Sequence, residues 1–220
     1  MSLCAAIFDM NGTLVDDIAF HYRAWRMLAE RHGFAMDEAL FQSFNGQKNA
    51  DIFPRLFGGK IDDAEIDALA REKESIYREL YRPHLAPVRG AVALLERLRE
   101  RGVRLALASS APEENRALVL DGLDWHGMFD AVVDSAGLPG KPAPDIFLAA
   151  AQRLGCTPAE CIVFEDAENG VRAAKAGGFA CIGITTNVDP DRLRDAGATL
   201  TVAHFDALPQ DLDAILRPTH

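Results

Sequence analysis

The stretch Cys4-Ala-Ala-Ile-Phe8, followed at once by Asp9-Met-Asn-Gly-Thr13, decides the fold of this chain. A short apolar run that ends in a carboxylate and a turn sequence is typical of a strand buried on both faces, with a polar loop at its carboxyl end. Strands of this kind belong to parallel sheets that helices cover on both sides. We therefore expect a strand of an α/β domain here.

The rest of the chain repeats this alternation. Further apolar runs occupy residues 103–108, 131–133, 161–164 and 180–184. Helical patterns that end at a glycine occupy residues 91–101, 144–154 and 170–176. Strands that alternate with helices indicate a doubly wound, Rossmann-like parallel sheet.

One interval interrupts the alternation and reads as helices alone. Helices are expected over 18–32, 37–44 and 63–81, with a short piece over 51–56 that Pro54 interrupts. The last long helix has a start signal in Asp62 and Glu65. We predict a core domain of residues 1–16 and 87–220 and an inserted all-helical cap domain of residues 17–86. Its two connections to the core can act as a hinge.

Composition limits the function classes. The chain has 220 residues, 49% of them hydrophobic, and a net charge of −10 from 23 Lys and Arg against 33 Asp and Glu. This charge argues against nucleic-acid and anionic-membrane partners, because such surfaces need clustered cations. The four cysteines form no C-x-x-C pair and are expected to be reduced core residues. We expect a cytoplasmic protein, monomeric or weakly dimeric.

The predicted strands end in polar residues, and ligands of doubly wound sheets bind beyond the carboxyl ends of the strands. The first strand is followed by Asp9-Met-Asn-Gly-Thr13, the next by Ser109-Ser110, a later loop holds Lys141-Pro-Ala-Pro144, and the fourth strand is followed by Glu165-Asp166. Together, and in this order, the four motifs resemble the haloacid dehalogenase-like (HAD) superfamily over essentially the whole chain. The helical insertion and the run His21-Tyr-Arg-Ala-Trp25 are most similar to beta-phosphoglucomutase-like members.

The chemistry of the residues agrees with that resemblance. The Asp9 carboxylate is a candidate nucleophile that attacks phosphorus and holds the phosphoryl group as an acyl phosphate. A carboxylate near a phosphate dianion is repelled, so the site needs the positive charge of Mg²⁺ and Lys141. Asp166 is the natural second magnesium ligand. Glu165 is a further residue of the predicted metal site, and we expect it to act from behind the direct ligands.

Phosphate ligands are expected after the second strand. The Ser109 hydroxyl and the Ser110 N–H can meet phosphate oxygens at the start of a helix that Pro112 opens. Gly12 lets the backbone approach a ligand closely, and Thr13 can fix the turn. The resemblance implies that the backbone carbonyl of Asn11 completes the protein's magnesium ligands.

Asn11 departs from the superfamily pattern. Its phosphatases carry Asp-x-Asp, whose second aspartate acts as general acid and base, and an amide cannot exchange a proton at neutral pH. Three alternatives follow: the chemistry is weakened, the substrate has a good leaving group such as an acyl phosphate, or the reaction differs, as in phosphonate-cleaving enzymes. In that last case Lys48 would be the candidate Schiff-base lysine.

The remaining candidates lie in the predicted cap. The resemblance gives His21 and Lys73 roles in assisting substrate and nucleophile. Where beta-phosphoglucomutases have an arginine for a second phosphate, this chain has Asn49, with Lys48 as a possible substitute cation. The apolar stripe with Trp25 and Leu28 is expected to be cap core.

These observations predict a Mg²⁺-dependent phosphohydrolase that acts on a small phosphorylated metabolite through an aspartyl phosphate. The alternatives are a binding protein that recognises a phosphorylated ligand without turnover, a beta-phosphoglucomutase-like enzyme and a phosphonate-cleaving enzyme.

Overall fold

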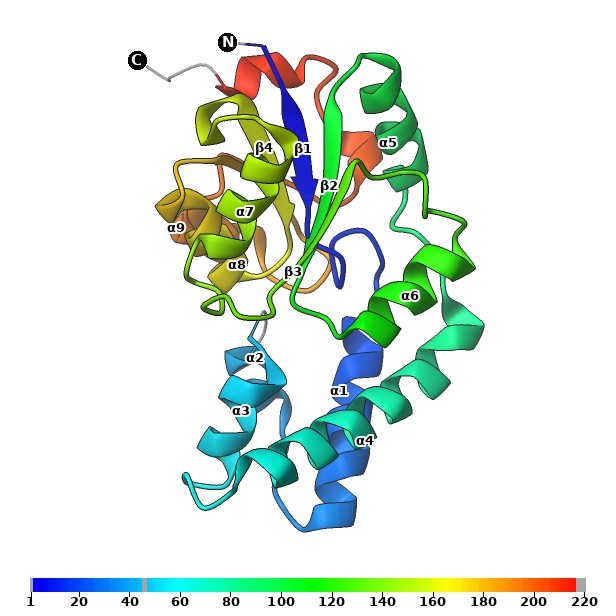
Figure 1. Ribbon diagram of the computed structural model, residues 1–220, viewed down its shortest axis with the longest axis vertical. Helices are drawn as coiled ribbons and strands as arrows, with labels where there is room; N and C mark the ends of the chain where they lie inside the picture. The colour runs from blue at the N-terminus through cyan, green and yellow to red at the C-terminus, as the bar shows by residue number, and fades with distance from the viewer. Residues whose placement is uncertain (1, 45–46, 217–220) are drawn as a thin grey trace.

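A six-stranded parallel sheet forms the centre of the molecule (Figure 1). The computed structural model describes residues 2–44 and 47–216. Within these residues the strand order is β3-β2-β1-β4-β5-β6, and every pairing is parallel. The strands are β1 (Ala5–Phe8), β2 (Arg104–Ser109), β3 (Ala131–Asp134), β4 (Cys161–Glu165), β5 (Ala180–Ile184) and β6 (Leu200–Val202). The predicted doubly wound fold is confirmed. β6 was not predicted, because three residues give no apolar run.

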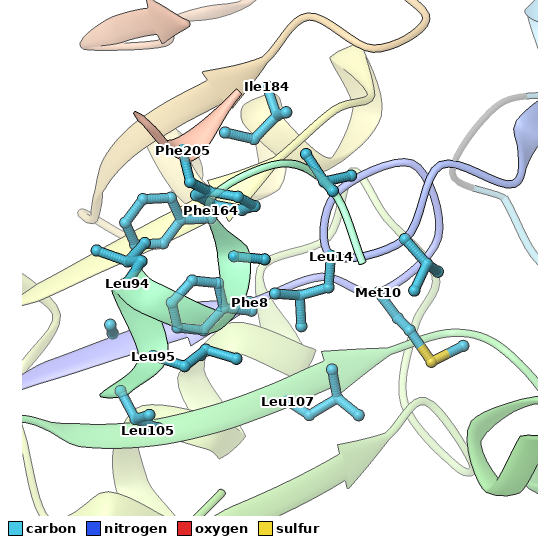
Figure 2. Packing of buried hydrophobic residues seen from close by; sticks show 14 of the residues in the cluster. Phe8, Met10, Leu14, Leu94, Leu95, Leu105, Leu107, Phe164, Ile184 and Phe205 are labelled. Carbon is cyan, nitrogen blue, oxygen red and sulfur yellow. The ribbon is translucent and has the colours of Figure 1, made fainter. Parts of the chain in front are cut away.

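Helices cover both faces of the sheet. On one face lie α5 (Ala91–Glu100) and α6 (Glu113–Gly122), and on the other lie α7 (Asp145–Leu154), α8 (Glu168–Ala176) and α9 (Pro190–Ala196). Successive strand residues point to opposite faces. Phe8 therefore stacks on Phe164, with ring centroids 4.5 Å apart, on the side of Leu95 of α5 (Figure 2). Ile7 packs on the opposite face, in the cluster that includes α7.

β1 lies in the middle of the sheet, and this position brings the predicted motifs to one edge. β1 pairs with β2 on one side and with β4 on the other, so that Phe8 lies opposite both Leu107 and Phe164. The residues that follow these three strands consequently emerge at one edge of the sheet. The strand order reverses between β1 and β4, and this is where doubly wound sheets bind ligands.

Four helices gather beyond that edge (Figure 1). They are α1 (Ile18–His32), α2 (Glu38–Ser43), α3 (Asn49–Leu56) and α4 (Asp63–Tyr81). Their buried side chains, among them Trp25, Leu28 and Phe53, form a hydrophobic cluster separate from the two that cover the sheet. Residues 18–44 and 47–81 contain no strand. The exact division between core and cap remains a prediction.

Helix boundaries differ from the predictions mainly at α3. This helix begins at Asn49 and continues through Pro54, because Ile52 and Phe53 are buried in the cap cluster. α4 begins as predicted, with a capping box between Asp62 and Glu65. None of the helices in the described ranges combines the length and the apolar character needed to cross a membrane.

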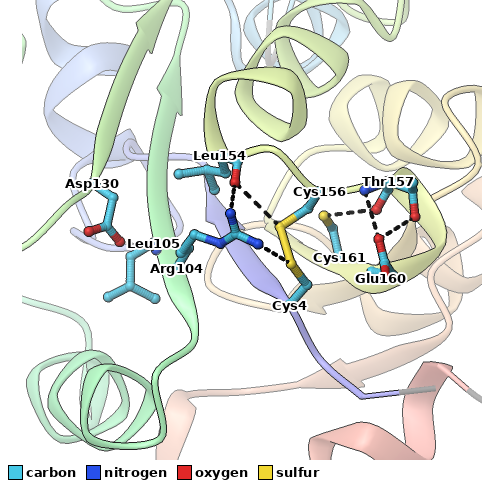
Figure 3. The surroundings of a disulfide bond; sticks show 9 residues. All are labelled: Cys4, Arg104, Leu105, Asp130, Leu154, Cys156, Thr157, Glu160 and Cys161. Carbon is cyan, nitrogen blue, oxygen red and sulfur yellow. Dashed lines mark hydrogen bonds between the residues drawn. A yellow bond between two sulfur atoms is a disulfide. The ribbon is translucent and has the colours of Figure 1, made fainter.

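The cysteine prediction is wrong for one pair. Cys4 and Cys156 form a disulfide (Figure 3), at the opposite edge of the sheet from the polar motifs. Cys161 and Cys181 are free and buried as predicted. The two bonded cysteines are 152 positions apart in the chain, with Cα atoms separated by 6.3 Å. Cys4 lies directly before β1, and Cys156 lies between α7 and β4, the strand that pairs with β1. The fold thus brings the two cysteines together, and sequence spacing does not reveal such a pair.

Candidate functional site

A cleft of about 560 Å³ lies between the carboxyl edge of the sheet and the four cap helices. Core residues and cap residues both line it. Eleven predicted site residues are among them: Asp9, Asn11, His21, Lys48, Asn49, Lys73, Ser109, Ser110, Lys141, Glu165 and Asp166. The structure therefore brings together, around one space, residues that are far apart in the sequence.

A buried charged cluster forms the floor of this cleft. Lys141 Nζ donates one hydrogen bond to Asp9 Oδ1 and one to Glu165 Oε1, each 2.6 Å long. The Lys141 side chain is only 5% exposed. Asp166 is equally buried beside them and accepts a hydrogen bond from Thr13 Oγ1 at 3.3 Å. When ionised, three carboxylates surround one ammonium group, which leaves two negative charges in excess.

The pKa values of the cluster reflect this imbalance. Burial raises the pKa of Asp9 to about 7, although the charge of Lys141 opposes the shift. Burial also holds the pKa of Asp166 well above its usual range, and the charges of Glu165 and Asp9 add to the effect. For Lys141, burial acts to lower the pKa, but the charges of Asp9 and Glu165 outweigh it and raise the pKa. A further cation would stabilise the ionised carboxylates.

The donor set fits a magnesium ion. Asp9 and Asp166 supply hard carboxylate oxygens, and Mg²⁺ needs only one or two of these because waters and phosphate oxygens complete its coordination. Gly12 adopts φ +75°, and a Cβ at this position would collide with the Asp166 carboxylate. The turn after β1 therefore packs directly against Asp166. Within the described ranges, no three His, Cys, Asp or Glu side chains form a metal site by themselves.

Glu165 has both of its carboxylate oxygens engaged. Oε1 accepts the hydrogen bond from Lys141, and Oε2 accepts one from the Ala167 N–H at 2.8 Å. Gly170 lies so close that a Cβ there would overlap the Glu165 side chain. This arrangement favours a role in holding Lys141 over direct metal coordination.

The two serines at the carboxyl end of β2 form another wall of the cleft. Ser109 is 1% exposed, and its Oγ accepts a hydrogen bond from the Ala111 N–H at 3.1 Å. Ser110 Oγ is buried, and no polar atom of the described residues bonds to it. A buried hydroxyl without a partner is costly, so this one is suited to a ligand oxygen. By contrast, the Gly12 N–H donates to Val15 O and Asp17 Oδ1, and it is not available to a phosphate.

Asn11 belongs to a second polar group, at the junction between β1 and α1. Its Nδ2 donates to Asp17 Oδ2 and lies 3.1 Å from His21 Nε2 and 3.4 Å from Tyr77 Oη. Asp17 is fully buried and also accepts hydrogen bonds from the Tyr77 hydroxyl and from the Gly12 N–H, the latter at 3.0 Å. The His21 ring stacks on the Tyr77 ring, with centroids 3.7 Å apart.

A third polar group joins the cap to the core. Glu74 of α4 accepts hydrogen bonds from Lys73 Nζ at 2.9 Å, Asn49 Nδ2 at 2.7 Å and Asn115 Nδ2 of α6 at 2.7 Å. Arg78 donates to Asn115 Oδ1 at 2.9 Å. Asn49 and Lys73, both predicted to meet the substrate, thus already bond to Glu74.

Lys48 makes a separate bridge from cap to core. Its Nζ donates to the backbone oxygens of Ser135 at 2.7 Å and Leu138 at 2.5 Å, in the loop after β3. These two bonds hold the Lys48 amino group at the loop after β3.

Several residues of these groups were not predicted. Asp17 is predicted only as the first residue of the cap domain, although a carboxylate directly before a helix is a signal for a hydrogen-bonding role. Tyr77, Glu74 and Asn115 gave no sequence signal, because they sit among the ordinary apolar and charged residues of amphipathic helices. Trp25 is 3% exposed and belongs to the hydrophobic cluster of the cap as predicted, where it packs on Phe53, yet it also lines the cleft.

Comparisons with known proteins agree with this geometry. Residues 5–178 match the family of haloacid dehalogenase-like hydrolases. A validoxylamine A 7'-phosphate phosphatase from Streptomyces hygroscopicus subsp. limoneus is 32% identical over 202 residues, which cover 89% of this chain and 92% of the relative. A beta-phosphoglucomutase from Bacillus subtilis (strain 168) is 34% identical over 189 residues, with 82% of each chain covered.

A solved structure shares the whole architecture. The crystal structure of a beta-phosphoglucomutase from Clostridium difficile superposes with a TM-score of 0.86 at 27% identity, covering 98% of this chain and 97% of that one. The sheet order, the motif positions and these similarities agree, and the chain belongs to the haloacid dehalogenase-like hydrolase family.

Proposed function

We propose that this protein is a magnesium-dependent phosphohydrolase that acts on a small phosphorylated metabolite through a phosphorylated Asp9. The observation that carries the proposal is the charged cluster on the cleft floor, where Lys141 bridges Asp9 and Glu165 beside Asp166. Two excess negative charges suit a divalent cation. The relative named as a validoxylamine A 7'-phosphate phosphatase supports the reaction class.

Each residue of the cluster has a distinct task in this proposal. The Asp9 carboxylate attacks phosphorus, and Lys141 offsets the repulsion between that carboxylate and the phosphate. Ser109 and Ser110 hold phosphate oxygens, since the Ser110 hydroxyl lacks a partner on the cleft wall. The carboxylates of Asp9 and Asp166 and the backbone carbonyl of Asn11 would hold Mg²⁺, and the ion would neutralise negative charge at the phosphate. Glu165 positions Lys141.

The four helices of residues 17–86 act as a cap in this proposal. The cleft lies between them and the core, so that their closure would shield the phosphoryl group from bulk water. The bridge from Lys48 to the loop at Ser135 and the bridge from Glu74 to Asn115 join the two parts. A cytoplasmic location and a monomeric or weakly dimeric state stay predictions.

The contacts of Asn49 and Lys48 disfavour two alternatives. A mutase with a bisphosphate intermediate needs a cation for the second phosphate. Asn49 instead bonds to Glu74, and Lys48 is occupied by backbone oxygens. A Schiff base would require the Lys48 amino group to leave the two backbone oxygens to which it bonds in the loop after β3.

A substrate panel tests the proposal. The panel contains acetyl phosphate, p-nitrophenyl phosphate, sugar phosphates and a phosphonate, each with Mg²⁺ and with a chelator. We expect turnover of at least one phosphorylated compound that requires Mg²⁺ and falls by ~10⁴-fold or more in Asp9→Asn, as for other catalytic nucleophiles. Binding of phosphorylated compounds without any turnover would instead establish a binding protein.

A further inference from the structure

We propose that Lys48 is a positioning residue for Lys141. From the cap, Lys48 fixes the core loop that leads to Lys141, so that the place of this lysine beside Asp9 depends on contact between cap and core. The inference rests on the proposed phosphohydrolase function and adds a means of regulating the same site. It follows from the contacts between the start of α3 and the loop that joins β3 to α7.

The first step concerns the bonds of Lys48 to this loop. Lys48 Nζ donates to Ser135 O at 2.7 Å and to Leu138 O at 2.5 Å. The Leu138 N–H also donates to Ser135 O, at 3.1 Å, so these two residues close a turn. The Lys48 amino group therefore bonds to both ends of one turn, and this fixes the turn relative to the cap.

The second step concerns the cap end of the bridge. Lys48 directly precedes α3, and its backbone oxygen accepts hydrogen bonds from the Asp51 N–H at 3.0 Å and from the Ile52 N–H at 3.2 Å. Ile52 is 3% exposed and belongs to the hydrophobic cluster of the cap. The Lys48 side chain thus extends from a backbone that the first turn of α3 and the cap cluster hold in place.

The third step is a packing contact that does not depend on these hydrogen bonds. A Cβ at Gly140 would lie 2.9 Å from Asp51 Oδ2 and 3.8 Å from Lys48 Cε. Gly140 does not have the positive φ for which glycine is often needed. Its lack of a side chain instead makes room for the start of α3, which packs directly on the backbone of the loop.

The fourth step leads from the loop to the cleft floor. Lys141 follows Gly140 in the chain, and its Nζ donates to Asp9 Oδ1 and Glu165 Oε1, each over 2.6 Å. Loss of the Lys48 bridge would free the loop and, with it, the backbone of Lys141. A misplacement of about 1 Å in an active site can lower a reaction rate by ~10²-fold. The bridge therefore matters for the position of Lys141 at Asp9.

Direct contact of Lys48 with the substrate is the competing explanation, because Lys48 also lines the cleft. The two explanations differ in kinetics. A side chain that binds the substrate equally in the ground state and the transition state changes KM, whereas one that acts only on the transition state changes kcat. A positioning role through Lys141 therefore predicts an effect on kcat.

Three variants test the inference. Lys48→Met removes the two hydrogen bonds and keeps a long side chain. Lys48→Arg is the conservative variant, because it retains donors that can bond to the two backbone oxygens. Lys60→Met is the matched control, since Lys60 is an exposed lysine of the same helical insertion and is not among the residues that line the cleft. Thermal unfolding checks that each variant folds.

The first measurement is amide hydrogen exchange, read by peptide mass spectrometry without substrate. In Lys48→Met, exchange in residues 135–141 should become faster by ~10-fold or more, because two hydrogen bonds of ordinary strength no longer hold the loop. The rest of the core should exchange as in wild type. Lys48→Arg and Lys60→Met should leave the exchange of this loop close to that of wild type.

The second measurement is kcat and KM for p-nitrophenyl phosphate and acetyl phosphate with Mg²⁺. In Lys48→Met, kcat should fall by ~10- to 10²-fold with little change in KM. Lys48→Arg should recover most of this loss, and Lys60→Met should match wild type.

Four outcomes overturn the inference. Unchanged exchange in Lys48→Met would show that the loop does not depend on Lys48. A higher KM with unchanged kcat would make Lys48 a substrate ligand, and an equal loss in Lys60→Met would show a general effect of cap charge. In these three cases the phosphohydrolase function stands. If wild type turns over neither compound with Mg²⁺, nor any other of the substrate panel, the proposed function fails and the inference with it.

Discussion

Two buried lysines, one in the core and one in the cap, stand in opposite electrostatic surroundings. Lys141 forms ion pairs with Asp9 and Glu165 and has Asp166 beside it, whereas Lys73 forms an ion pair with the single carboxylate of Glu74. Both side chains are almost fully buried, at 5% and 3% exposure. The number of carboxylates around each lysine therefore makes the difference.

The pKa values of the carboxylates in the two groups differ accordingly. Burial raises the pKa of Asp9 to about 7 in the core cluster. Burial also acts to raise the pKa of Glu74, but the charges of Lys73 and His21 and its hydrogen bonds lower it to about 2. The charges of Lys73 and Glu74 in the cap balance each other, which suits a structural role. The core cluster of Asp9, Lys141, Glu165 and Asp166, by contrast, lacks positive charge. That deficit marks the core as the place where a cation and a reacting anion belong.

The largest expected effect comes from removing the core lysine. Lys141→Met leaves the buried carboxylates of Asp9 and Glu165 without their cation, and breaking a buried ion pair in this way costs about 3–5 kcal/mol. Lys73→Met is the matched variant and should cost less, because Glu74 keeps the hydrogen bonds from Asn49 and Asn115. Urea unfolding measures both. Equal losses, or a larger loss for Lys73→Met, would break the comparison.

The second prediction concerns how the contribution of Glu74 to stability depends on pH. The pKa of Glu74 is lowered from 4.5, so its ionised form stabilises the fold fully above about pH 4.5 and loses this contribution as the pH falls toward 2. The shift corresponds to about 3 kcal/mol. The difference in unfolding free energy between wild type and Glu74→Gln should be largest near neutral pH and shrink on acidification. A difference independent of pH would show that Glu74 acts through packing alone.

Magnesium should stabilise the core cluster more modestly. An ion that binds only the folded state adds about 2.7 kcal/mol when present at ~100 times its dissociation constant. Thermal unfolding should therefore shift upward with Mg²⁺ in wild type and far less in Asp166→Asn. Asp67→Asn, which alters another acidic residue on the cleft wall, is the control and should keep the shift. An equal shift in all three proteins would place the ion elsewhere.

The sequence predicted those features that depend on local pattern. Apolar runs gave five of the strands. The residues at the carboxyl ends of β1, β2 and β4 gave the acidic residues of the cleft floor and the serines of its wall, because parallel strands end at one edge. The capping signals Asp62 and Glu65 predicted the start of α4 at Asp63. The family assignment from these motifs is confirmed.

Contacts between residues that only the fold brings together could not be predicted from the sequence. The disulfide joins residues 152 positions apart, and the Glu74–Asn115 bond links two helices that only the fold brings together. Asn11 was identified as unusual, but its amide orientation depends on Asp17 and Tyr77. The tasks predicted for Lys48 and Asn49 assumed free side chains, whereas both are occupied by protein partners.

The most direct test of the central claim is to trap the phosphorylated side chain. Wild type, mixed with acetyl phosphate and Mg²⁺, is quenched and reduced with borohydride, which converts an aspartyl phosphate to homoserine. We predict that peptide mass spectrometry finds this conversion at Asp9, only in the presence of Mg²⁺, and not in Asp9→Asn. Steady turnover with no conversion at Asp9, or with conversion at another aspartate, would contradict the account.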